Sequence, residues 1–139
     1  MRYLHTMVRV TDLDASLRFY RDALALEVTR RGDVPAGRFT LVYLAPRGQS
    51  EAEIELTHNW DPEVYAGGRN FGHVAYEVND IHAACERLLA HGVTINRSRR
   101  DGRMAFVRSP DGISIKLLQA GRALAPARPW MLMRNVGAW

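Results

Sequence analysis

The sequence has very little cysteine and no long hydrophobic run. Its one cysteine, Cys85, cannot form a disulfide within the chain, and a buried, small apolar role is the usual one for such a residue. No stretch approaches the eighteen or more apolar residues of a membrane-spanning helix, and residues 1–6 do not have the layout of a signal peptide. We therefore expect a protein of the cytoplasm that does not associate with membranes.

Lysine is almost absent, although basic residues outnumber acidic ones by 19 to 15. Lys116 is the one lysine, and the remaining basic residues are arginines spread along the chain. No expected helix carries a basic stripe, and the arginine cluster at residues 97–103 lacks interleaved aromatic side chains. This distribution favours a small anionic ligand over nucleic acid. A content of 47% hydrophobic and 24% charged residues is that of a globular domain.

The chain contains an internal repeat, because residues 3–24 and 71–92 follow one pattern 68 positions apart, so that His5 corresponds to His73. A match of this length indicates a duplicated structural module. In each copy a strand pattern precedes a helical one, and three further strand patterns follow. The expected strands are 4–10, 26–31, 39–44 and 52–57, then 70–78, 93–96, 104–108 and 113–119, with helices at 12–24 and 80–91 and a turn at 32–37.

These elements predict an α+β fold of two βαβββ modules. The modules, residues 1–58 and 70–119, share one domain that spans residues 1–119. Residues 59–69 contain a proline and paired glycines, as expected of a linker. The tail at 120–139 begins with alanine, proline and arginine and then becomes apolar. So many apolar groups indicate that it packs on the domain or on a partner subunit.

Strand alternation places a group of polar side chains on the face away from the helices. Ile54 and Leu56 suit the core, so Glu55 between them points to the opposite face. The same parity puts His5 and its repeat partner His73 on that face. A lone strand histidine is more often structural, but two at equivalent positions with a carboxylate suit a divalent cation with positions left open. The sequence thus predicts a metal site of His5, Glu55 and His73.

The fourth position of this arrangement carries a lysine. Aligning residues 54–56 with residues 115–117 in the repeat places Lys116 where the first copy has Glu55. An ammonium group has no lone pair to give to a metal, and no Asp or Glu follows Asp111. We interpret Lys116 as an isolated substitution at a ligand position, which predicts a metal that is weakly bound or absent.

Four motifs that cover about residues 1–119 accompany these features, namely Leu4–Val10, Ile54–Trp60, Phe71–His73 and Ser109–Gly112. In order and spacing they resemble lactoylglutathione lyase (glyoxalase I) of the vicinal-oxygen-chelate superfamily. The resemblance implies a homodimer of paired βαβββ modules. It also implies a metal, nickel or cobalt rather than zinc, that His5 and Glu55 of one subunit hold together with His73 and residue 116 of the other. In the family the last position is a glutamate that serves as ligand and proton-transfer base.

The resemblance further implies that the hemithioacetal of glutathione and methylglyoxal is isomerised to S-lactoylglutathione. The metal would acidify the carbon-bound proton, with Glu55 as one base and Lys116 at the position of the other. Arginine suits the carboxylates of glutathione. The positions that match the family's substrate contacts are Arg9, Asn59 and Arg69 for the γ-glutamyl end, Arg97 and Arg103 for the glycyl end, and Met104 with Phe71 around the aldehyde-derived group.

Two other functions stay open at this level. A non-catalytic binding protein of the same superfamily, like the bleomycin-resistance proteins, needs no metal, and Lys116 favours it. An extradiol-type dioxygenase with two histidines and one carboxylate fits the number of metal ligands. Its reaction, however, has no role for the arginines that match the glutathione contacts. Metal content followed by a hemithioacetal assay separates the three.

Overall fold

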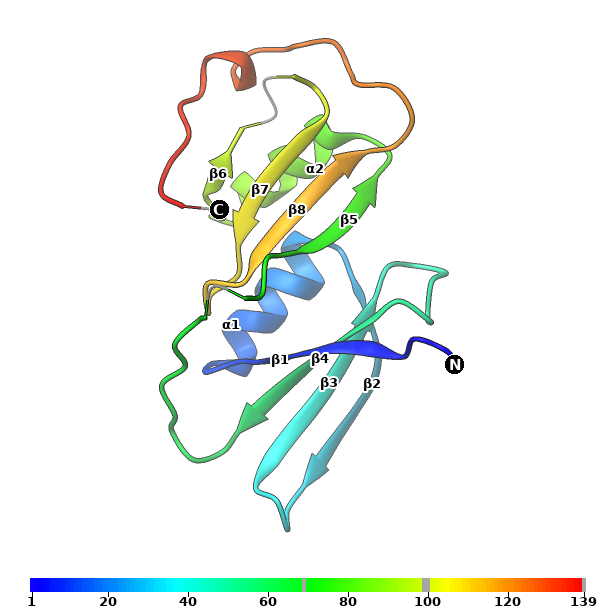
Figure 1. The fold of residues 1–139 in the computed structure, drawn as a ribbon, viewed down its shortest axis with the longest axis vertical. Coiled ribbons are helices and arrows are strands. Elements are labelled where there is room, and N and C mark those ends of the chain that lie inside the picture. The colour runs from blue at the N-terminus through cyan, green and yellow to red at the C-terminus, as the bar shows by residue number, and fades with distance from the viewer. Residues whose placement is uncertain (69, 99–100, 139) are drawn as a thin grey trace. The chain divides into compact units, whose positions relative to one another are not determined.

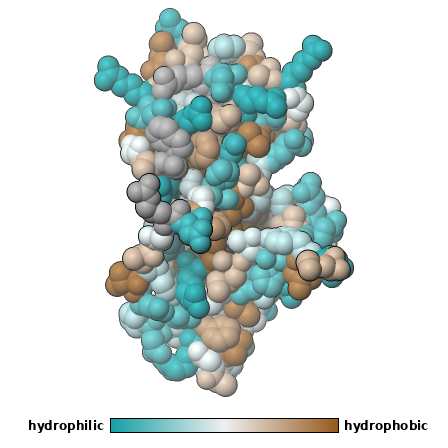
Figure 2. Space-filling model, in the orientation of Figure 1, coloured by the Kyte–Doolittle hydropathy of each residue, from teal (hydrophilic) through white to brown (hydrophobic). Residues whose placement is uncertain are grey.

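The computed structural model describes residues 1–68, 70–98 and 101–138 (Figure 1). The chain divides into two compact units, Met1–Ala66 (unit 1) and Gly67–Trp139 (unit 2), and each is described by itself. Among the described residues no helix is both long and apolar enough to span a membrane. On the face shown in Figure 2, hydrophilic and hydrophobic residues are interspersed.

Unit 1 is a four-stranded mixed sheet with one helical segment. The sheet order is β1-β4-β3-β2, in which β1 runs parallel to β4 and the other pairs are antiparallel. Asp12 caps the helical segment by accepting a hydrogen bond from the backbone N–H of Ala15 at 2.8 Å. The elements are β1 His5–Arg9, α1 Leu13–Leu17, the π-helical η1 Arg18–Ala23, β2 Glu27–Val34, β3 Phe39–Ala45 and β4 Glu53–Asn59.

Unit 2 repeats this topology, with sheet order β5-β8-β7-β6 and β5 parallel to β8. Asp80 caps its helix as Asp12 does in unit 1, by accepting from the N–H groups of His82 and Ala83. The predicted α+β fold of two βαβββ modules is therefore confirmed. The elements are β5 Val74–Val78, α2 Ile81–Ala90, β6 Ile95–Arg97, β7 Met104–Arg108, β8 Ser114–Gln119 and the 3₁₀ turn η2 Trp130–Leu132.

The buried faces of the sheets follow the expected parity. In β4, Ile54 and Leu56 are 1% and 0% exposed, and in β8 Ile115 and Leu117 are buried in the same way. Each pair lies on the apolar core face of its sheet, so the residue between them, in either unit, faces the other way. Cys85 is buried in α2 and forms no disulfide within the chain, as its single occurrence requires.

Two predicted boundaries are wrong by three or more residues. The turn expected at residues 32–37 is shorter, because β2 continues to Val34 and pairs there with Phe39. Gly32 is tolerated inside β2 because this is an exposed strand at the edge of the sheet. The strand expected at 70–78 starts only at Val74, whose register partner Ile115 lies one residue inside β8.

The tail packs on unit 2 by several backbone contacts. Val136 exchanges hydrogen bonds with Asn96 of β6, its N–H donating to the Asn96 carbonyl at 2.8 Å and its carbonyl accepting from the Asn96 side chain at 3.1 Å. The Leu124 N–H donates to the Gly102 carbonyl at 3.0 Å. Gly102 has φ of +64°, and a Cβ there would lie 1.8 Å from the Leu124 carbonyl oxygen. This close approach therefore requires glycine.

Trp130 anchors the tail, because it is 2% exposed and its carbonyl accepts from the Ser98 hydroxyl at 2.8 Å. We expect Trp130→Ala to lower the free energy of unfolding by about 3 kcal/mol or more, the usual cost of removing a buried tryptophan. Denaturant titration measures this change. The neighbouring Met131, 45% exposed, is the matched control, and Met131→Ala should change the unfolding free energy by less than about 0.5 kcal/mol. Equal effects of the two substitutions would contradict an anchoring role.

Candidate active site

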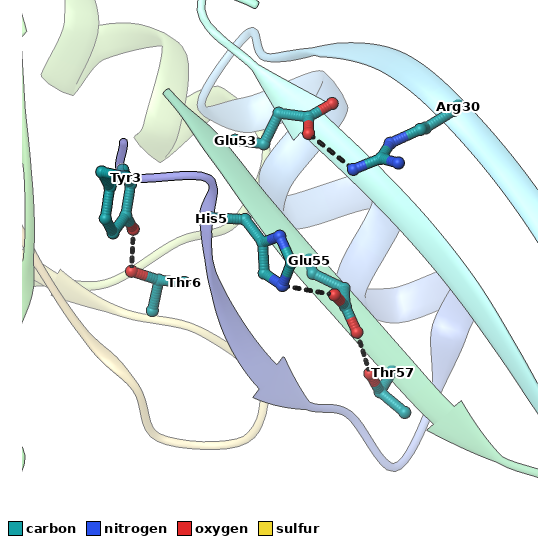
Figure 3. Close-up of polar contacts among 7 residues, drawn as sticks. All are labelled: Tyr3, His5, Thr6, Arg30, Glu53, Glu55 and Thr57. Atoms are coloured by element: carbon teal, nitrogen blue, oxygen red, sulfur yellow. Dashed lines mark hydrogen bonds and ion pairs between the residues drawn. The ribbon is translucent and has the colours of Figure 1, made fainter. Parts of the chain in front are cut away.

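In unit 1 the predicted histidine and carboxylate meet. His5 lies at the start of β1 and Glu55 in the parallel neighbour β4, and their side chains bring Nε2 and Oε2 to 2.8 Å (Figure 3). Glu55 is 8% exposed, and its Oε1 accepts a hydrogen bond from the Thr57 hydroxyl at 2.9 Å. This contact confirms that His5 and Glu55 share a face of the sheet.

The spacing of this pair suits two ligands of one cation. Nitrogen and oxygen ligands at metal distances of roughly 2.0–2.2 Å stand about 3 Å apart when they are adjacent in the coordination shell. His5 Nδ1 is buried and has no hydrogen-bond partner among the described residues. No hydrogen bond at Nδ1 therefore holds the ring in the tautomer with a protonated Nε2, which could not bind a metal through Nε2. Unit 1 therefore fits a divalent cation at this pair.

Three further side chains surround the pair. The His5 ring meets Tyr43 of β3 edge to face, with centroids 5.5 Å apart. The Arg30 guanidinium lies 3.6 Å above the Tyr43 ring and donates to Glu53 at 2.8 Å. These residues, with His5, line an open cavity of about 550 Å³ within unit 1. A polar, partly aromatic cavity beside a histidine–carboxylate pair is a reasonable place for a small ligand.

The ionisation of the surrounding groups follows from these contacts. Burial raises the pKa of the Tyr43 phenol, and a hydrogen bond to Glu55 raises it further, so the phenol stays neutral and faces the carboxylate. A hydrogen bond from Thr29 lowers the pKa of Glu53, and Arg30 adds to this effect against the opposing effect of burial. Glu53 is therefore held as a carboxylate and neutralises Arg30.

Unit 2 holds the other two predicted residues around an aromatic ring. His73 directly precedes β5 and meets Phe106 of β7 edge to face, with centroids 5.6 Å apart. Lys116 of β8 pairs in register with Phe106, and its Nζ lies 5.8 Å from the ring centroid. His73 and Lys116 therefore share a face, as predicted. That His73 joins the pair of unit 1 stays a prediction.

Strand register extends the internal repeat to the neighbours of these residues. Tyr43 pairs with Glu55 in unit 1 as Phe106 pairs with Lys116 in unit 2, and the residue next across the sheet is an arginine in both units. Sequence reasoning did not identify Arg30, Tyr43 or Phe106 as part of the site, although the same repeat alignment, carried across the sheet, could have found them. The equivalent sets are His5, Arg30, Tyr43 and Glu55 in unit 1 and His73, Arg97, Phe106 and Lys116 in unit 2.

The fourth position does not fit a metal. Lys116 is half-buried and presents an ammonium group, which has donors and no lone pair. No group of three or more metal-binding side chains from His, Cys, Asp and Glu lies together within the described parts of the chain. His5 and Glu55 can therefore serve as ligands of a cation, whereas Lys116 cannot.

The predicted substrate contacts divide between the units. Arg9 is exposed in β1, and Asn59 at the end of β4 donates to Glu63 at 2.8 Å. In unit 2, Arg97 NH1 lies 3.0 Å from the Met104 sulfur. Arg103 donates to the Gly121 carbonyl at 2.8 Å. Arg69 lies outside the described residues, and Phe71 is 50% exposed.

Comparison with known proteins places these features in one family. Residues 2–117 match the model of the Glyoxalase/Bleomycin resistance protein/Dioxygenase superfamily. The lactoylglutathione lyase of Neisseria meningitidis serogroup A is 42% identical over 125 residues, which cover 86% of this chain and 91% of that protein. The trypanothione-dependent glyoxalase I of Leishmania major is 40% identical, with a TM-score of 0.77 and 86% of both chains covered. Glyoxalase I from Zea mays is 30% identical, with a TM-score of 0.77 over 87% of this chain and 45% of that one.

Proposed function

Because this chain belongs to the lactoylglutathione lyase (glyoxalase I) family of the glyoxalase/bleomycin resistance protein/dioxygenase superfamily, we propose that it isomerises the glutathione–methylglyoxal hemithioacetal to S-lactoylglutathione, at a rate reduced by Lys116. The observation that carries the proposal is the 2.8 Å contact between His5 and Glu55, which preserves one half of a ligand set. The relatives named above, which match over most of this chain, support the same reaction.

In this proposal Glu55 is the general base that transfers the proton. The reaction moves a proton between two adjacent carbons, and a carboxylate within reach of both can accept it from one and return it to the other. The Thr57 hydroxyl and His5 hold the Glu55 carboxylate in place. Lys116, at the second base position, is a proton donor and not an acceptor.

A divalent metal, nickel or cobalt rather than zinc, belongs to the proposed active form. His5, Glu55 and His73 would hold it, and when bound it would supply Lewis acidity that lowers the pKa of the transferred proton. Lys116 adds a positive charge at the remaining position, so the protein as it stands should bind the metal weakly. Metal content of the purified protein, followed by turnover of the hemithioacetal with added nickel, tests the proposal directly.

Arg9 is proposed to bind the γ-glutamyl end of the substrate. Its guanidinium is exposed and has no ion pair among the described residues, so it is available for a substrate carboxylate. We expect Arg9→Ala to weaken binding of S-lactoylglutathione by about 1–3 kcal/mol, the scale of a charge-assisted hydrogen bond. Calorimetric titration measures the affinity. Arg31→Ala in β2 removes an exposed arginine of the same charge and should leave it unchanged. If Arg9→Ala also has no effect, the ligand is not a glutathione adduct bound in this way.

We also propose that the chain works as a cytoplasmic homodimer in which one subunit supplies His5 and Glu55 and the other supplies His73. Among the described residues neither unit brings three metal-binding side chains together by itself, and a closed twofold assembly would complete both sites at once. Sedimentation at micromolar concentration should therefore show a dimer. A stable monomer would remove the shared-site arrangement.

A non-catalytic binding protein is the second candidate function. The lysine at position 116 favours it, because a ligand can occupy a cavity without a metal. If the protein binds S-lactoylglutathione but forms none from the hemithioacetal with nickel present, this second candidate is the better description.

A further inference from the structure

We propose that unit 2 contains an anion-binding site for a small carboxylate, formed by Lys116, Ser114 and His73 beside Phe106. It occupies the place in unit 2 that corresponds to the His5–Glu55 pair of unit 1. The lysine is thus a ligand-binding residue in its own right and not only a lost metal ligand.

The first observation is a concentration of positive charge around one ring. Lys116 Nζ lies 5.8 Å and Arg97 Cζ 5.9 Å from the centroid of Phe106, and the edge-to-face contact of His73 is with this same ring. Phe106 is 8% exposed, so its ring forms an apolar floor beneath charged groups. Charges beside such a floor interact with a ligand more strongly than charges in open solvent.

The second observation is an unpaired hydroxyl on the same face. Ser114 precedes Lys116 by two residues in β8, so both side chains point to the face opposite the buried Ile115. Val74 pairs with Ile115, which puts His73 level with Ser114. The Ser114 hydroxyl oxygen is buried and has no hydrogen-bond partner among the described residues. A buried hydroxyl without a partner is costly, and a carboxylate oxygen would satisfy it.

The third observation is the reversal of charge between the two units. Where unit 1 has Glu53 and Glu55, unit 2 has Ser114 and Lys116. Glu53 neutralises Arg30 in unit 1, but within the described residues neither Arg97 nor Lys116 has an ion pair. The cluster in unit 2 therefore lacks a counter-charge, and a bound anion would supply it.

Two acidic residues lie near enough to be considered. Glu77 is on the same face of β5 and is exposed. It lies two residues beyond Ala75, which is the register partner of Lys116. Asp101 lines a cavity of about 320 Å³ with Arg97, but its carboxylate accepts from the backbone N–H groups of Arg103 and Met104. Neither forms an ion pair with Lys116, so the ammonium is free to bind a ligand carboxylate.

Acetate and its neutral isostere acetamide test the site without any assumption about the reaction. In a nuclear magnetic resonance titration, acetate should shift the resonances of His73 and Phe106 with saturation, and acetamide should not. Lys116→Met keeps the length of the side chain and should weaken acetate binding at least tenfold. Arg31→Met, an equal change of charge in unit 1, should leave it unchanged. If Arg31→Met weakens binding as much as Lys116→Met, or if acetate and acetamide behave alike, the proposal is overturned.

Ser114→Ala provides a second test. Ser16 of α1 also has a buried hydroxyl without a partner among the described residues, so Ser16→Ala is the matched control. We expect Ser114→Ala to weaken acetate binding about three- to tenfold and Ser16→Ala to leave it unchanged. A Ser114→Ala variant that binds acetate like the parent would remove Ser114 from the site.

If the proposed function also holds, the site predicts a substrate class, namely glutathione adducts whose sulfur-linked group carries a carboxylate. S-carboxymethylglutathione should then bind at least tenfold more tightly than S-carbamoylmethylglutathione, which replaces the carboxylate by an amide, and Lys116→Met should abolish the difference. Equal binding of the two adducts contradicts this substrate class while leaving the lyase proposal intact. Failure of both adducts to bind, with acetate binding retained, contradicts the glutathione proposal alone.

Discussion

Lys116→Glu should convert a protein that binds nickel poorly into one that binds it at least about a hundredfold more tightly. Two unit charges about 4 Å apart at an effective dielectric constant of about 20 interact by roughly 4 kcal/mol, and replacing the lysine turns repulsion into attraction. Each 1.4 kcal/mol of that change corresponds to a factor of about ten in affinity. Conversion of the methylglyoxal hemithioacetal should rise with metal occupancy.

Metal titration of the parent and the variant, followed by assay of S-lactoylglutathione formation, measures both effects. Lys116→Gln is the control, because it removes the repulsion without supplying a carboxylate and should give an intermediate nickel affinity. Folding should be retained in both variants, since Lys116 is half-buried and its contact with Phe106 contributes only about 0.5–1 kcal/mol. A parent protein with near-stoichiometric metal, and turnover that glutamate does not improve, would place residue 116 outside the ligand set.

Glu55→Gln, introduced together with Lys116→Glu, should lower turnover by about a hundredfold or more. The amide keeps the size of the side chain and can still accept from Thr57, but it neither accepts a proton nor carries the charge that binds a cation. General base catalysis by a positioned side chain contributes about 10²–10⁴-fold. Steady-state kinetics should show the loss mainly in kcat, and metal titration should show weaker nickel binding.

The matched control is Glu53→Gln, two residues earlier in β4. Glu53 pairs with Arg30 and does not contact His5 through an ion pair, so its replacement should change turnover by less than about tenfold. If both glutamine variants lose activity equally, the effect comes from disturbance of the strand and not from the chemistry of Glu55. If neither loses activity, Glu55 is not a base in this reaction.

The repeat and the parity of the strands could be read from the sequence because both are local. Side chains alternate along any strand, so the buried pair Ile54 and Leu56 is enough to direct Glu55 to the opposite face. The same rule directed His5 to that face, and its 2.8 Å contact with Glu55 confirms the shared face. The 68-residue offset of the two copies predicted the same order of elements in each, which the two sheets show.

The neighbours of these residues were decided by the tertiary structure. Arg30, Tyr43 and Phe106 come to the site through pairing between strands, and the register depends on where each hairpin turns. The turn after β2 illustrates this, because glycine and proline predicted it several residues too early, while pairing with β3 extends the strand to Val34.

The sequence by itself therefore determined the fold, the faces of the strands and the types of side chain at the candidate site, including the lysine at position 116. Only the folded chain determined that this lysine shares an aromatic ring with His73 and Arg97, and that the Ser114 hydroxyl is buried and has no hydrogen-bond partner among the described residues. The physical reason is that alternation follows from the backbone of one strand, whereas contacts across a sheet follow from the packing of segments distant in sequence.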